Sequence, residues 1–215
     1  YHTVTAQRLE GGLDKDGKVH AFKHRSAFPT ISALFVPGMK TPGVGEMGMG
    51  LTDSPVYAPN FQMESGAVAA HVRVGWMRSV NNISHAFAVQ SFVGELATAA
   101  NKDPKDFLLE FIGPARHQDL AKLGKGYHNY DDSLDRYPYD TARLTHVVEK
   151  VANMAAWGQK LPKGRGMGIA AHRSFLSYVA TVVEVEVDDN GNLTIPKVWM
   201  AIDAGTVVNT DTVKN

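Results

Sequence analysis

Apolar and polar residues alternate in the first part of the chain with the two-residue period of β-strands. Residues 3–13 and 19–28 form two such runs, and the connection at residues 14–17 contains an Asp-Gly pair suited to a hairpin turn. Residues 29–59 are rich in proline and glycine and show little periodicity, which predicts a long irregular excursion. Residues 63–74 resume a strand pattern, so a hairpin, an irregular segment and a third strand are predicted in this order.

The middle of the chain carries apolar residues at three- and four-residue spacing, which predicts helices. The first helix is expected at residues 83–100, and the second, at residues 105–112, follows the start signal Asp103-Pro104. A third helix is expected to begin after Asp140 as its N-cap. The apolar stripes of the first and third helices consist of Val89, Phe92, Val93, Leu96, Ala97 and Ala100, and of Leu144, Val147, Val148, Val151, Met154 and Ala155.

A strand pattern returns in the last third of the chain. Three valines alternate with Glu184 and Glu186 over residues 183–187, which is typical of a strand with one solvent-exposed face. A turn at residues 189–192 leads into a further strand at residues 193–202. Strands followed by helices and again by strands predict an α+β fold, in which β-hairpins and a mixed sheet are packed by about three helices.

The composition excludes several classes of function. The 215 residues contain 22 Lys and Arg against 22 Asp and Glu, so no general positive field favours nucleic acid. No apolar run is long enough to predict a membrane-spanning helix. Without cysteine the chain cannot hold a thiolate-ligated iron–sulfur cluster. Because residue 1 is a tyrosine that already reads as part of a strand, we expect an internal fragment of a longer protein.

The strongest candidate site is the run Gly-Trp-Met-Arg-Ser-Val-Asn-Asn at residues 75–82, directly before the first predicted helix. A glycine-led loop that carries Arg78 to a helix N-terminus offers backbone N–H groups and positive charge to an anionic ligand. The alternative is an ordinary ion pair between Arg78 and a carboxylate at a corner between a strand and a helix. The residues alone favour this alternative.

Four other features are weaker candidates. The Gly-x-Gly-x-x-Gly run at residues 43–48 precedes no helical stripe, so it does not predict a dinucleotide site. The nine histidines lack the spacing of a metal site, and no metal ligand is predicted. His172 and Ser174 lack a nucleophile elbow and are interpreted as ordinary strand residues. Gly164, Gly166 and Gly168 are interpreted as a bulge at the start of a strand.

Several short stretches, taken in order, resemble the molybdopterin-binding large subunit of molybdenum hydroxylases, the xanthine dehydrogenase and aldehyde oxidase family. The resemblance is closest to the branch of the isoquinoline 1-oxidoreductase beta subunits and spans nearly the whole chain. Its motifs are Tyr57-Ala58-Pro59-Asn60, the loop at residues 75–82, Ala86-Phe87-Ala88-Val89-Gln90-Ser91-Phe92, Glu95-Leu96-Ala97, Gly164-Arg165-Gly166-Met167-Gly168-Ile169-Ala170, a strand from Ser174 to Val187, Ile202-Asp203-Ala204-Gly205 and Val207-Val208-Asn209. Ala204 and Thr210 depart from the cysteine and proline usual in the family.

The resemblance implies roles for the loop residues. Met77, Arg78 and Ser79 are expected to contact the molybdopterin cofactor, and Val80 is expected to face the substrate. The family's catalytic glutamate lies in a Gly-x-Gly-Glu run that is expected downstream of this fragment. Glu46 stands in a similar run, but its position before the other motifs makes it a coincidence in a flexible loop.

The resemblance also implies a domain division and a function. Residues 1–100 would be part of the first molybdopterin-binding domain, and residues 101–215 a helical connector and the start of the second. The whole protein would hydroxylate N-heteroaromatic compounds or oxidise aldehydes with water as the oxygen source, whereas the isolated fragment is expected to be inactive. The implied cofactor is molybdopterin in a dinucleotide form, with iron–sulfur clusters in a small partner subunit and a periplasmic or membrane-associated location. The alternative is a non-enzymatic α+β binding or scaffold module.

Overall fold

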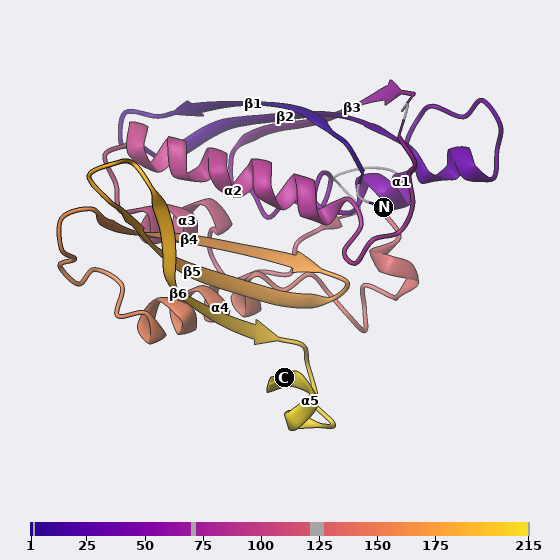
Figure 1. Ribbon diagram of the computed structural model, residues 1–215. Coiled ribbons are helices and arrows are strands. Elements are labelled where there is room, and N and C mark those ends of the chain that lie inside the picture. The colour runs from indigo at the N-terminus through magenta and orange to yellow at the C-terminus, as the bar shows by residue number, and fades with distance from the viewer. Residues whose placement is uncertain (2, 70–71, 121–126, 215) are drawn as a thin grey trace.

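The computed structural model describes residues 1, 3–69, 72–120 and 127–214, which form two three-stranded sheets and several helices (Figure 1). The predicted α+β class is confirmed. The strands are β1 (Ala6–Leu13), β2 (Val19–Pro29), β3 (Asn60–Val68), β4 (Arg165–Ser174), β5 (Ser177–Val187) and β6 (Leu193–Asp203). The helices are η1 (Ile31–Leu34), α1 (Val44–Met47), α2 (Asn82–Ala99), α3 (Pro104–Ile112), η3 (Asn129–Asp131), α4 (Thr141–Met154) and α5 (Thr210–Lys214).

The first sheet has the order β1-β2-β3 and is mixed, as predicted. β1 and β2 form the expected antiparallel hairpin, and β2 pairs in parallel with β3 after the excursion at residues 30–59. Its outer face carries charged side chains. The carboxylate of Glu64 lies 2.8 Å from the ammonium nitrogen of Lys23 and 2.5 Å from the guanidinium nitrogen Nε of Arg25. The inner face carries Phe22 and Phe28, both buried, towards α2.

The second sheet, β4-β5-β6, is antiparallel throughout. Helix α2 runs between the two sheets, and α4 lies along the opposite face of the second sheet (Figure 1). Buried residues from the first sheet, α2, α3, α4 and the second sheet belong to one hydrophobic cluster. The proposed division at residue 100 therefore runs through a shared core, and the domain assignment stays a prediction.

The helix boundaries follow local capping signals. Asp103 accepts hydrogen bonds from the backbone of Lys105 and Asp106, and Pro104 opens α3, as predicted. Asp140 caps α4 through the N–H of Ala142 at 2.8 Å. The predicted stripe of α4 is buried from Leu144 onwards, except that Met154 is 48% exposed.

Three strand predictions were wrong in detail. β3 ends at Val68 rather than residue 74. The expected strand from Ser174 to Val187 is interrupted by a hairpin turn, in which Phe175 and Leu176 have positive φ values of 47° and 68°. Glu184 was expected on a solvent-exposed face but is buried, because it follows Ala180 and Val182 on the covered face of β5, where its carboxylate accepts from Arg165 at 3.2 Å.

Candidate functional site: the arginine loop

Residues 75–81, called here the arginine loop, lead directly into the N-terminus of α2. The N–H of Val80 donates to the carbonyl of Met77 at 2.7 Å and closes a turn. Ser79 and Val80 have φ values of 63° and 48°, in the left-handed region that non-glycine residues rarely adopt. The N–H of Asn82 then donates to the carbonyl of Ser79 at 3.0 Å, which joins the turn to the helix.

The predicted site residues are adjacent in this loop but differ in exposure. Met77 is 44% exposed and Arg78 is exposed, whereas Ser79 is half-buried and Val80 is only 8% exposed. Val80 therefore anchors the loop in the interior, while Met77 and Arg78 lie at the surface. The indole of Trp76 packs against Phe35 with ring centroids 5.7 Å apart.

Arg78 has no hydrogen bond, ion pair or ring contact with any other part of the chain that the structure describes. The ordinary ion pair that the residues alone favoured is thus not formed there. An exposed guanidinium with all its N–H groups available can bind an anionic group through two parallel hydrogen bonds.

The N-terminus of α2 adds further donors beside Arg78. Of its first N–H groups, that of Asn82 is used by Ser79 and that of His85 by the carbonyl of Asn81 at 3.2 Å. Within the described chain, no acceptor is found for the N–H groups of Ile83 and Ser84, as is usual in the first turn of a helix. Asn81 is fully buried, and its side-chain oxygen has no donor among the described residues. The loop thus combines a free cation, free N–H groups and an unsatisfied acceptor.

Glu46 has a structural role that the sequence did not reveal. Its carboxylate accepts from the hydroxyl of Thr30 at 2.5 Å, the N–H of Ile31 at 2.7 Å and the N–H of Gly43 at 3.1 Å. These bonds join η1 to α1, so the segment is a short, fixed helix rather than the flexible loop predicted. All three partners are groups of this chain's own fold.

A buried polar network lies behind the loop. His85 bonds Ser26 and the carbonyl of Met49, each at 2.8 Å, and His24 bonds Gln7 at 2.7 Å. His172, from β4, bonds the side chain of Asn82 at 2.8 Å. Burial lowers the pKa of His24 to about 3 and those of His85 and His172 to about 4, so all three are neutral near pH 7.

This network is not predictable from the sequence pattern, in which His172 reads as an ordinary strand residue. The bonded pairs are separated by as many as 90 positions in the chain, so no spacing rule links them. The only local signal was the Asn-Asn pair at residues 81–82, which follows the arginine loop and opens α2.

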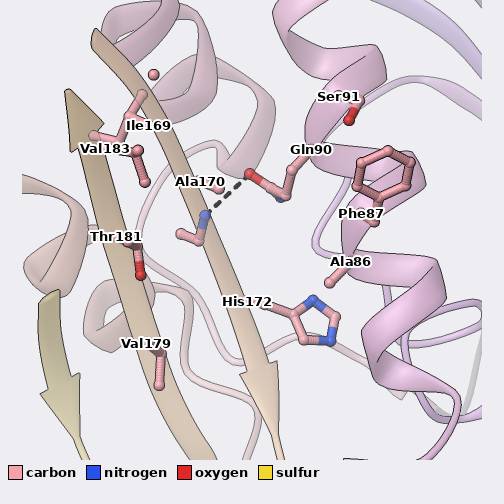
Figure 2. A pocket seen from close by; sticks show the side chains of 12 residues that line it. Ala86, Phe87, Gln90, Ser91, Ile169, Ala170, His172, Val179, Thr181 and Val183 are labelled. Atoms are coloured by element: carbon pink, nitrogen blue, oxygen red, sulfur yellow. Dashed lines mark hydrogen bonds between the residues drawn. The ribbon is translucent and has the colours of Figure 1, made fainter. Parts of the chain in front are cut away.

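A groove of about 470 Å³ lies between α2 and the face of β4 and β5 that is turned towards this helix, beside the network (Figure 2). Its walls include Phe87 from α2 and Val179 from β5, and the side-chain oxygen of Gln90 accepts from the N–H of Ala171 at 3.0 Å across it. His172 lines the same groove and points from β4 towards α2 (Figure 2). The predicted bulge glycines behave as part of a regular strand here, since Gly166 and Gly168 pair in register with Val185 and Val183.

No helix in the described residues is long and apolar enough to cross a membrane.

Comparison with known proteins found similarity along the whole chain, although no family model matches. The chain is 27% identical to a subunit of the nicotinate dehydrogenase of Pseudomonas putida over 99% of its residues, and 26% identical to the beta subunit of isoquinoline 1-oxidoreductase of Brevundimonas diminuta over 100%. It is 32% identical, over 100% of its residues, to a membrane-bound aldehyde dehydrogenase of Gluconacetobacter polyoxogenes whose name specifies pyrroloquinoline quinone. The predicted resemblance to isoquinoline 1-oxidoreductase beta subunits is thereby confirmed.

The chain spans only a part of these relatives. It covers 18% of the nicotinate dehydrogenase subunit, 25% of the isoquinoline oxidoreductase subunit and 28% of the aldehyde dehydrogenase. Among solved structures, the aldehyde oxidoreductases of Desulfovibrio gigas and Desulfovibrio desulfuricans are similar over 90% of this chain and 21% of theirs, each with 14% identity and with TM-scores of 0.41 and 0.42.

Proposed function

We propose that this chain is part of the molybdopterin-binding subunit of an oxidoreductase that hydroxylates N-heteroaromatic compounds or oxidises aldehydes. The observation that carries the proposal is the similarity, along the whole of this chain, to three dehydrogenase or oxidoreductase proteins, combined with the free Arg78 at the N-terminus of α2. Because the chain spans less than a third of each relative, we expect the isolated residues to be inactive.

The loop fits the anionic part of molybdopterin. The Arg78 guanidinium and the N–H groups of Ile83 and Ser84 are donors without an acceptor in the described chain, and they stand where the helix dipole is positive. In this arrangement Met77, Arg78 and Ser79 hold the cofactor, and the substrate lies on the side of Val80, whose side chain is only 8% exposed in this chain.

When bound, the cofactor would supply the two-electron oxidation that introduces oxygen from water into the substrate. The residues described here bind and orient that group and keep its anionic part paired with N–H donors. The family's catalytic glutamate is expected downstream of residue 215. Glu46 is not a substitute for it, because three hydrogen bonds commit its carboxylate to the fold.

Electron transfer is expected to use iron–sulfur clusters outside these 215 residues. The chain has no cysteine, so iron–sulfur clusters would lie outside these residues, in another domain or subunit, and a small partner subunit is consistent with the subunit names of two relatives. The dinucleotide form of the cofactor and the periplasmic or membrane-associated location remain part of this proposal. The division into two molybdopterin-binding domains at residue 100 is included as well.

The test is cofactor analysis of the whole parent protein, purified with its co-encoded partner. Molybdenum, pterin and pyrroloquinoline quinone would be measured in the wild type and in Arg78→Ala, Arg78→Lys and Arg136→Ala variants. Arg136 is a matched control, because it is also exposed but its guanidinium lies 5.1 Å from the ring centre of Tyr137.

We expect molybdenum and pterin in the wild type and in Arg136→Ala, and about a tenfold lower content in Arg78→Ala, the size of one lost charge-assisted interaction. Arg78→Lys should retain an intermediate amount, since lysine keeps the charge but not the planar fork. If the parent protein contains pyrroloquinoline quinone and no molybdenum, the cofactor is that quinone and not molybdopterin. Absence of all three cofactors would favour the binding or scaffold module.

A further inference from the structure

The arginine loop holds a backbone conformation that its own sequence disfavours. Ser79 and Val80 both lie in the left-handed region, which suits glycine and is least suited to a β-branched residue such as valine. Such a conformation persists only where surrounding contacts hold it. The turn hydrogen bond from Val80 to Met77 is one such contact, but it lies within the loop itself.

Asn82 supplies a contact from outside the loop. Its side-chain N–H donates to the carbonyl of Ser79 at 3.0 Å, and Asn82 itself is only 1% exposed. This bond fixes the orientation of the amide, so its oxygen is the acceptor and points away from the loop. The oxygen accepts from the hydroxyl of Tyr130 at 3.4 Å and from His172 at 2.8 Å.

His172 in turn fixes Asn82. Because the Asn82 oxygen can only accept, the proton of the neutral imidazole must be on Nε2. Burial lowers the pKa of His172 to about 4, which keeps the ring in this neutral form near pH 7. The ring is carried by β4, a strand of the second sheet, and projects towards α2 (Figure 2). A chain of two hydrogen bonds thus runs from the second sheet to the backbone of Ser79.

We infer that His172 and Asn82 are positioning residues for the arginine loop: they hold the carbonyl of Ser79 and so set the direction in which Arg78 leaves the backbone. The expected effect of these residues on cofactor retention rests on the function proposed above, whereas their effect on the shape of the loop is independent of that function. Neither side chain needs to touch the cofactor, since both act through the backbone next to Arg78.

Trp76 provides a reporter of loop shape that is independent of cofactor. It lies in the loop, is 61% exposed and packs against Phe35, whereas Trp157 bonds Asp103 at 3.0 Å and Trp199 belongs to β6. With three tryptophans in the chain, fluorotryptophan NMR of the 215-residue chain gives one loop signal and two internal controls.

Four variants separate hydrogen bonding from packing. His172→Met keeps a side chain of comparable size without a donor, and His172→Gln restores an N–H donor near the position of Nε2. Asn82→Asp replaces the donor to Ser79 with a carboxylate oxygen. His117→Met changes an exposed histidine and is the control. The molybdenum and pterin content of the parent protein is measured for the same four substitutions.

We expect His172→Met and Asn82→Asp to move the Trp76 signal, leave those of Trp157 and Trp199 in place and lower cofactor content about tenfold, as for one lost buried hydrogen bond. His172→Gln should return both readouts towards wild type, and His117→Met should change neither. An unmoved Trp76 signal in His172→Met, or a shift of all three signals that glutamine does not reverse, would overturn the inference. If Trp76 responds as expected while Arg78→Ala retains its cofactor, the positioning role stands and the proposed cofactor site fails.

Discussion

The imidazole of His85 accepts the hydroxyl proton of Ser26 at 2.8 Å while its other nitrogen donates to the carbonyl of Met49, also at 2.8 Å. This pair joins α2 to β2 and to the segment before Gly50 through a ring that must be neutral. A second proton on the ring would leave Ser26 without its acceptor and place a charge in the interior.

The first prediction is loss of stability in acid. His24, His85 and His172 titrate near their ordinary pKa of 6.5 in the unfolded chain but only at about 3 or 4 in the folded protein. The unfolded state therefore binds more protons as the pH falls below 6.5, and the free energy of unfolding decreases until about pH 4. Relative to pH 8, each histidine should lower the free energy of unfolding at pH 5 by about 2 kcal/mol. Thermal melts between pH 8 and pH 4 would measure the loss.

Asp53 acts in the opposite direction but does not cancel this loss. Burial raises its pKa to about 7, so its folded form takes up a proton before the unfolded form does as the pH falls. One carboxyl group opposes three imidazoles. His85→Gln should reduce the slope of the free energy of unfolding against pH by up to the equivalent of about one proton. Stability that is constant from pH 8 to pH 5 would contradict the prediction.

The parts of the fold that were predictable from sequence depend on neighbours in the chain. The Asp-Gly turn at residues 14–17 and the caps Asp103 and Asp140 each act on backbone within four residues, so their patterns predicted the structure correctly. The turn at Phe175 and Leu176 was missed because neither residue is typical of positive φ. There the partner strands, rather than the local sequence, impose the turn.

The unpredicted parts of the site depend on contacts between distant residues. Glu184 reads as a solvent-exposed strand residue until Arg165 is placed beside it. The position of Arg78 at a helix N-terminus could be predicted, because the loop and α2 are consecutive in the chain. The bond from His172 to Asn82 could not, since it requires knowing that β4 packs against the start of α2.

The second prediction concerns Arg173, which is only 1% exposed. Its guanidinium donates to Asn129 at 2.7 Å and to Tyr127 at 3.2 Å, and it lies 4.8 Å from the ring centre of Tyr139. Arg173→Met would remove these donors and leave buried acceptors unpaired, so the free energy of unfolding should fall by about 3 kcal/mol. Urea unfolding measures the loss. Arg8→Met, at an exposed ion pair with Glu10, should change it by less than about 1 kcal/mol. Equal effects at the two positions would contradict the role assigned to Arg173.

The third prediction concerns the cap of α4. Asp140→Ala removes the acceptor for the N–H of Ala142 and should lower the free energy of unfolding by about 1 kcal/mol. Asp140→Asn should retain most of the stability, because asparagine also caps helices well. Asp135→Ala is the control, since this exposed aspartate precedes the helix without capping it. The midpoints of urea unfolding compare the three variants, and an Asp140→Ala midpoint equal to that of Asp135→Ala would reject the capping role.

The last prediction compares two glycines in neighbouring helices. Gly113 ends α3 with φ of 77°, and a Cβ atom there would overlap the ring of Tyr57, whose backbone N–H is held by the carbonyl of Phe111 at 2.8 Å. Gly113→Ala should therefore destabilise the protein by about 3 kcal/mol, through backbone strain and overpacking together. Gly94 lies inside α2 with open space at its Cβ position, so Gly94→Ala should stabilise by up to about 1 kcal/mol. The melting temperatures of the two variants are compared. Because the same substitution is made at both positions, opposite shifts would show that the effect depends on the site and not on alanine itself. A stabilised Gly113→Ala protein would contradict the prediction and show that Tyr57 can move aside.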